Sequence, residues 1–104
     1  MPNRFRFRTA LSLESHFDDH CDEVGAASEA EYEQMASDFM SGDVPANTLE
    51  CARRRDGARI RYNWVSQEFA ILSGDGFLLT FFKPDPKYHG LSTNRAYFDW
   101  ECRK

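Results

Sequence analysis

The second half of the chain contains four short strand-like runs, and their arrangement in pairs constrains the fold more than any other feature. Residues 48–54 and 59–63 are joined through Arg-Asp-Gly, and residues 68–73 and 77–82 through Gly-Asp-Gly. An Asp-Gly turn between two such runs is typical of a β-hairpin. The sequence therefore predicts two hairpins in succession, which together form a four-stranded antiparallel meander.

The first half of the chain predicts two helices. Residues 12–24 place apolar and aromatic side chains on one helical face, at Leu13, His16, Phe17, His20 and Val24. Gly25 ends this helix. A Ser-x-x-Glu capping box at residues 28–31 begins the second helix, in which apolar residues recur at helical spacing as far as Met40.

After the last predicted strand, Pro84 and Pro86 prevent its continuation. Residues 92–104 predict a short third helix, capped by Ser92 or Thr93. No linker or repeat divides the 104 residues, so residues 1–104 are expected to form one domain. The expected fold class is α+β, with two N-terminal helices on one face of a four-stranded antiparallel meander and a short C-terminal helix.

The cysteines and the hydropathy pattern limit the cellular setting. Cys21, Cys51 and Cys102 are widely spaced, without the CxxC or CxxxC pair that structural zinc sites use. Their odd number argues against a disulfide framework, so we expect three free thiols in a reducing compartment. No run of residues has the apolar length of a signal peptide or a membrane span, so no membrane association is expected.

Charge is distributed unevenly along the chain. Residues 9–52 contain eleven acidic side chains and no lysine or arginine, whereas all thirteen basic residues lie outside this segment. The acidic segment would repel a polyanion and the rest of the chain would attract it. The alternative interpretation is that the two parts simply neutralise each other in the folded protein.

The pentapeptide His-Phe-Asp-Asp-His at residues 16–20 places two of the three histidines on the apolar face of the first helix. Histidine is the usual general acid or base near neutral pH. In the first interpretation His16 and His20 are therefore catalytic residues. Their spacing also occurs in His-Glu-x-x-His zinc sites, with His89 or Cys21 as a third ligand, although Phe17 replaces the glutamate. In the third interpretation both imidazoles are hydrogen-bonded and inert.

Polar side chains on the predicted strands form a second set of candidates. Arg59 and Arg61 share one face of their strand, and Tyr62 lies on the other. The hydroxyl of Thr80 interrupts an apolar strand, so it either faces a cleft or reflects only the strand propensity of threonine. Lys83 directly follows that strand.

Five segments together carry a resemblance to a known family: HFDDH, SEAEYEQMASDFM, LECARRRDGARIRYN, EFAILSGDGFLLTFFKPDPKYHG and NRAYFDWEC. They resemble small C-terminal domains of bacterial polymorphic toxins and related prophage proteins, a family similar to the barnase–EndoU–colicin–RelE group of metal-independent ribonucleases. The resemblance runs from Ser12 onward, and its most specific feature is the order H-F-x-x-H, R-Y, G-x-x-x-T-x-F-x-P. Cys21 replaces the family's glycine, and Phe81 replaces its tyrosine.

This resemblance implies helices packed on a four-stranded antiparallel sheet and an endoribonuclease that uses no metal ion and no cofactor. In the implied reaction the ribose 2′-OH attacks its own 3′-phosphate and leaves a 2′,3′-cyclic phosphate. The residues carried over as catalytic are His16, His20, Arg61 and Thr80. The histidines would transfer protons, the guanidinium would hold the phosphate, and the hydroxyl would supply a hydrogen bond.

The binding residues and partners follow from the same resemblance. Because the acidic segment would repel RNA, the strands must bind it, and Arg59, Tyr62 and Lys83 are the expected contacts. The implied partners are RNA, with tRNA and rRNA as candidates, and a cognate immunity or antitoxin protein. The implied site of action is the bacterial cytoplasm, after delivery as the C-terminal part of a larger secreted protein.

Two further hypotheses stay open. In the first, the chain is a non-catalytic protein-interaction module of a secretion or prophage system. In the second, it is a metal-assisted hydrolase that uses His16 and His20.

Overall fold

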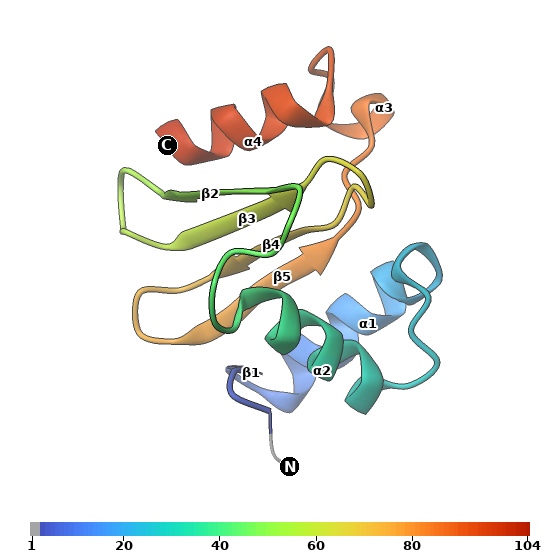
Figure 1. The fold of residues 1–104 in the computed structure, drawn as a ribbon. Coiled ribbons are helices and arrows are strands. Elements are labelled where there is room, and N and C mark those ends of the chain that lie inside the picture. Colours follow the sequence, from blue (N-terminus) through green and yellow to red (C-terminus); the bar gives the residue numbers. More distant parts are fainter. Residues whose placement is uncertain (1–2) are drawn as a thin grey trace.

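The two hairpins predicted from the Asp-Gly turns form the centre of the sheet in the computed structural model, which describes residues 3–104. The sheet has five strands in the order β1-β5-β4-β3-β2 (Figure 1). Their bounds are Arg6–Phe7 for β1, Thr48–Ala52 for β2, Arg59–Asn63 for β3, Phe69–Leu72 for β4 and Phe77–Phe82 for β5. The pairs β2–β3, β3–β4 and β4–β5 are antiparallel, as expected for the two predicted hairpins.

The strand β1 corrects the expected four-stranded antiparallel sheet to a mixed five-stranded one. It pairs in parallel with the start of β5, through Arg6 opposite Phe77 and Phe7 opposite Leu78. A strand of two residues has no recognisable periodicity, so the sequence did not indicate it. Because β1 covers only the first part of β5, the edge of β5 beyond Leu78 is not paired with a strand in the described part of the chain.

The two predicted N-terminal helices are confirmed. They are α1 (Ala10–Val24) and α2 (Glu29–Met40). The Thr9 hydroxyl caps α1 by accepting from the Ser12 amide, and Gly25, at φ 78°, ends it in the left-handed region. The Ser28 hydroxyl caps α2 by accepting from the Glu31 amide. Both helices cover one face of the sheet, where their buried core residues include Tyr32, Ala36 and Met40.

The C-terminal helix α4 (Asn94–Arg103) packs on the opposite face of the sheet, which corrects the expected single helical face (Figure 1). Its Phe98 lies against Tyr62, with 6.0 Å between the ring centroids. All four residues of β4 are buried, and an uninterrupted apolar run of this kind is typical of a strand covered on both faces. A fourth helix, the single turn α3 (Pro86–His89), follows the prolines that end β5.

A disulfide corrects the expectation of three free thiols. Cys51 in β2 is bonded to Cys102 in α4, with 6.1 Å between their Cα atoms, and Cys21 is free. The pairing could not be inferred from spacing because it depends on α4 folding back over the outer strand of the sheet. Such a bond forms in an oxidising compartment rather than a reducing one.

Reduction of this disulfide, or the double substitution Cys51→Ala/Cys102→Ala, should lower the free energy of unfolding by about 4 kcal/mol. The bond closes a loop across a sequence separation of 51 residues, and the chain-entropy model gives this magnitude for such a loop. Urea unfolding with and without reductant measures the effect. Cys21→Ala serves as the control and should leave the midpoint unchanged; equal midpoints for oxidised and reduced protein would contradict the prediction.

The β2–β3 turn contains an ion pair that should make the stability of the fold depend on pH in the acidic range. Arg53 donates from Nε and Nη2 to the two carboxylate oxygens of Asp56, at 3.0 and 2.8 Å. The hydrogen bond from Arg53, with a second from the Ala58 amide, lowers the pKa of Asp56 to about 2.

Because the pKa of Asp56 is lower in the folded chain, its contribution to stability is present above the unfolded value of about 4 and is lost as pH falls towards 2. Asp56→Asn should therefore be less stable than the parent at neutral pH, and the difference should shrink between pH 4 and pH 2. Thermal unfolding across this range measures both; a difference that stays constant would show that Asp56 acts through turn geometry alone.

Within residues 3–104, no helix has the length and apolar character needed to cross a bilayer.

Candidate active site

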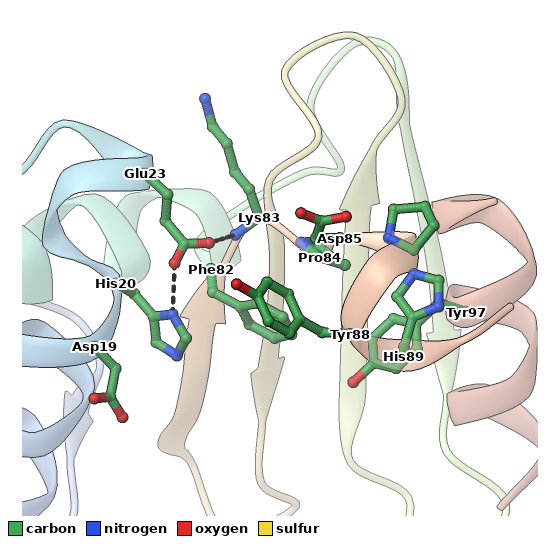
Figure 2. A pocket seen from close by; sticks show the side chains of 11 residues that line it. Asp19, His20, Glu23, Phe82, Lys83, Pro84, Asp85, Tyr88, His89 and Tyr97 are labelled. Atoms are coloured by element: carbon green, nitrogen blue, oxygen red, sulfur yellow. Dashed lines mark hydrogen bonds and ion pairs between the residues drawn. The ribbon is translucent and has the colours of Figure 1, made fainter.

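A cleft of about 870 Å³ opens between the C-terminal half of α1 and the segment that follows β5 (Figure 2). The helix supplies one wall, and the end of β5, α3 and the start of α4 supply the other. Eleven residues line it: Asp19, His20, Glu23, Phe82, Lys83, Pro84, Asp85, Pro86, Tyr88, His89 and Tyr97. The cleft thus combines one lysine, three carboxylates, two imidazoles and three aromatic rings.

His20 and Glu23 form a hydrogen-bonded pair on the α1 wall of the cleft. The imidazole Nδ1 lies 2.7 Å from Glu23 Oε1, as the dashed line in Figure 2 shows. An ionised carboxylate only accepts hydrogen bonds, so Nδ1 carries a proton. In the neutral imidazole the other nitrogen, Nε2, is then a free base beside the cleft.

Further contacts hold this pair in position. Glu23 Oε2 accepts a hydrogen bond of 2.9 Å from the Lys83 amide, which ties α1 to the end of β5. The Phe82 ring lies 5.0 Å from the His20 ring, centroid to centroid. Behind the pair, burial and the Glu23 carboxylate raise the pKa of the Tyr32 phenol, whose hydroxyl donates to the Phe81 carbonyl. The imidazole is therefore oriented by groups from both α1 and β5.

His16 lies one helical turn before His20, with 6.3 Å between the ring centroids, but it does not line the cleft. Its Nδ1 lies 2.9 Å from the Ser12 carbonyl oxygen and donates to it, which leaves Nε2 without an assigned partner. Its ring packs 5.2 Å from that of Phe7, the residue opposite Leu78. The structure therefore brings the two predicted histidines together along the same edge of β5.

Two further predicted residues lie at this edge. Thr80 is partly buried on β5, between Leu78 and Phe82. Leu78 is paired with Phe7, which packs against His16, and Phe82 packs against His20. The Thr80 side chain points to the same face as Phe82, although it is not part of the cleft lining. Lys83 does line the cleft, and it is the only lysine or arginine that does so in the described part of the chain.

Arg61 is placed in the interior, away from the cleft, which corrects its expected role in holding a phosphate. Its side chain is only 2% exposed and points towards α2. Nε donates to Glu50 at 2.6 Å, and the two terminal nitrogens donate to the carbonyl oxygens of Phe39, Ser41 and Gly42. A cation at this position satisfies the C-terminal carbonyl groups of α2. Its guanidinium therefore stabilises the fold.

Arg59 and Tyr62 do not line the cleft either, so the structure does not support them as RNA contacts there. Arg59 is exposed at the start of β3, the end of the sheet opposite the cleft. Tyr62 is buried under α4, and its hydroxyl donates to Gln67 at 2.8 Å. Burial raises the pKa of the Tyr62 phenol.

On the opposite wall, His89 has both ring nitrogens occupied. Nδ1 accepts from the Leu91 amide at 3.1 Å, so Nε2 carries the proton and donates to Asn94 Oδ1 at 3.0 Å. The ring stacks on Tyr97 at 4.6 Å, and burial raises the pKa of the Tyr97 phenol to about 12. His89 is thus a structural part of the cleft wall.

His89, one of the proposed third metal ligands, lies on the opposite wall of the cleft from His20. Within residues 3–104, no three His, Cys, Asp or Glu side chains are grouped as a metal site requires.

Several cleft residues were not found from the sequence. Glu23 had a signal: it follows His20 by three positions, which places both on one face of a helix. Phe82, Tyr88 and Tyr97 had none, because only the path of the chain after Pro84 brings them to the same cleft.

A ribonuclease from Escherichia coli, solved in complex with its inhibitor protein, has a similar structure. The TM-score is 0.55, and the alignment covers 84% of this chain and 95% of that chain at 18% sequence identity. The chain shares the fold of a bacterial ribonuclease. At this identity the likeness concerns the fold alone, and it shows no polymorphic toxin family. No protein-family model matches the sequence, and no curated protein matches it.

Proposed function

We propose that this protein is an endoribonuclease that cleaves RNA by transesterification in the cleft between α1 and β5. The observation that carries the proposal is the His20–Glu23 pair, in which a carboxylate fixes one imidazole nitrogen and leaves the other free at the cleft. The fold shared with a bacterial ribonuclease supports RNA as the substrate.

In the proposed mechanism His20 Nε2 removes the proton from a ribose 2′-OH. The 2′-oxygen attacks the adjacent phosphorus, the bond from phosphorus to the 5′-oxygen breaks, and a 2′,3′-cyclic phosphate and a 5′-hydroxyl form. Glu23 stabilises the imidazolium that results, because the carboxylate already accepts from its Nδ1. RNA carries its own nucleophile, so this route requires no metal ion.

Two other groups complete the proposed mechanism. Protonated His16, one turn away, is the candidate that gives a proton to the departing 5′-oxygen. Lys83 takes the phosphate-binding role first expected of Arg61, since it is the lysine of the cleft lining. Its side chain, which Figure 2 shows extending away from His20, would turn towards the cleft to contact the phosphate. Thr80 is retained as a hydrogen-bond donor at the same edge of β5.

A cognate inhibitor protein is part of the proposal, because the similar ribonuclease was solved with one. An inhibitor that occupied the cleft would block both His20 and Lys83. The Cys51–Cys102 disulfide supports delivery through an oxidising compartment before action on tRNA or rRNA in a bacterial cytoplasm.

The direct test is incubation of the purified protein with total bacterial RNA in the presence of EDTA. We expect fragments with 2′,3′-cyclic phosphate and 5′-hydroxyl ends. Fragments with 5′-phosphate ends would contradict the transesterification mechanism. RNA that stays intact over a wide range of protein concentrations, with and without added divalent metal, would favour the non-catalytic interaction module.

A further inference from the structure

Tyr88 is the most exposed large apolar side chain in the described part of the chain, with 90% of its surface accessible. It is also one of the residues that line the cleft. Figure 2 shows its ring extending from α3 over the cleft, towards the helix that carries His20. An aromatic ring left in water beside a catalytic cleft is available to a ligand, because burying it would be favourable.

The backbone around Tyr88 is firmly held, so its exposure does not result from a loose loop. The Asp85 side chain accepts from the Lys87 amide at 2.9 Å and begins α3. Gly90, at φ 78°, ends the turn with a hydrogen bond from its amide to the Pro86 carbonyl. After it, Asn94 donates from Nδ2 to the Pro84 carbonyl at 2.9 Å and closes the segment. Tyr88 is thus presented by a rigid turn.

The cleft lining around Tyr88 is aromatic. His89 and Tyr97 are stacked with an interplanar angle of 17°, and Phe82 packs edge-on against Tyr97. A planar ligand that stacked on Tyr88 would therefore lie beside further aromatic side chains of the same cleft.

We propose that Tyr88 is a stacking platform for one unpaired nucleobase next to the scissile phosphate. The inference rests on the proposed ribonuclease function and restricts its substrate class to single-stranded RNA. Bases in a duplex are stacked on their neighbours and paired, so their faces are not available to stack on Tyr88. Aromatic side chains stack on any of the four bases, so the platform selects unpaired RNA rather than a sequence.

The test measures binding separately from cleavage. A short, fluorescein-labelled, single-stranded oligonucleotide with 2′-deoxyribose in place of ribose cannot be cleaved, and its anisotropy reports affinity. Tyr88→Ala should weaken binding about 5- to 150-fold, the range expected for loss of one stacked base. Tyr88→Phe keeps the ring and should bind within about twofold of the parent. Trp64→Ala removes another exposed aromatic ring, outside the cleft, and is the matched control.

The outcomes separate the two proposals. Unchanged affinity of Tyr88→Ala, together with RNA cleavage by the parent protein, would overturn the platform and leave the ribonuclease intact. Tyr88-dependent binding without RNA cleavage would support the platform and overturn the ribonuclease. Equal affinity for a blunt duplex of the same sequence would also overturn the platform, since a duplex offers no free base.

Discussion

Replacing His20 by alanine should reduce RNA cleavage by about 10²- to 10⁴-fold, the range typical for loss of a general base. The imidazole is the one group at the cleft with a nitrogen fixed by a carboxylate and another left free. Fold stability should change little, because the His20 side chain is partly exposed at the cleft and is not part of the buried core. Single-turnover cleavage of a labelled RNA, compared with urea unfolding of the same samples, measures both quantities.

Glu23→Gln tests the second half of the pair. The amide oxygen can accept only one of the two hydrogen bonds that Glu23 accepts, and the substitution removes the charge that stabilises the imidazolium. We expect a loss of activity that is smaller than that of His20→Ala, and the double variant should be no slower than His20→Ala alone, since the carboxylate acts only through the imidazole.

For the Glu23→Gln test, Asp22→Asn removes a carboxylate from the same helix, outside the cleft lining, and controls for the change in charge.

For the His20→Ala test, activity within twofold of the parent would exclude His20 as the base and shift the role to His16.

The parts of the fold that depend on local chemistry could be predicted from the sequence. Apolar spacing and Ser28 located α2, and the two Asp-Gly turns located four of the five strands. The face on which α4 packs could not be obtained this way, because a short amphipathic helix fits either side of a sheet. The continuous apolar run of β4 was the available indication that both faces are covered.

The candidate site was only partly accessible to the same reasoning, since side-chain identity does not determine burial. The structure places both His20 and Lys83 in the lining of one cleft, at the end of α1 and after β5, and their roles stay predictions. Arg61 was expected to hold the phosphate because the family resemblance carried that role over to it. Its actual environment is created by the carbonyl groups at the end of α2, which lie about twenty residues earlier in the chain.

Replacing Arg61 by alanine should therefore destabilise the protein by about 3–5 kcal/mol, the cost typical of breaking a buried ion pair from one side. The substitution leaves the Glu50 carboxylate without its partner, exposes the carbonyl oxygens at the end of α2 to an apolar cavity, and removes a large buried side chain. Arg61→Lys should recover little of this loss, because one ammonium group cannot reach acceptors on both Glu50 and the α2 terminus in the geometry of a guanidinium.

The decisive measurement compares stability with activity for each folded molecule. Urea unfolding gives the fraction of Arg61→Ala that is folded, and RNA cleavage at low temperature, where the variant is most populated, gives the activity of that fraction. A structural role predicts near-normal activity per folded molecule, since the cleft is formed by α1, β5 and α3 rather than by β3. A fully stable but inactive Arg61→Ala variant would instead show that Arg61 binds the phosphate of the RNA. In that case the guanidinium would have to break its hydrogen bonds to Glu50 and to the end of α2 when RNA binds.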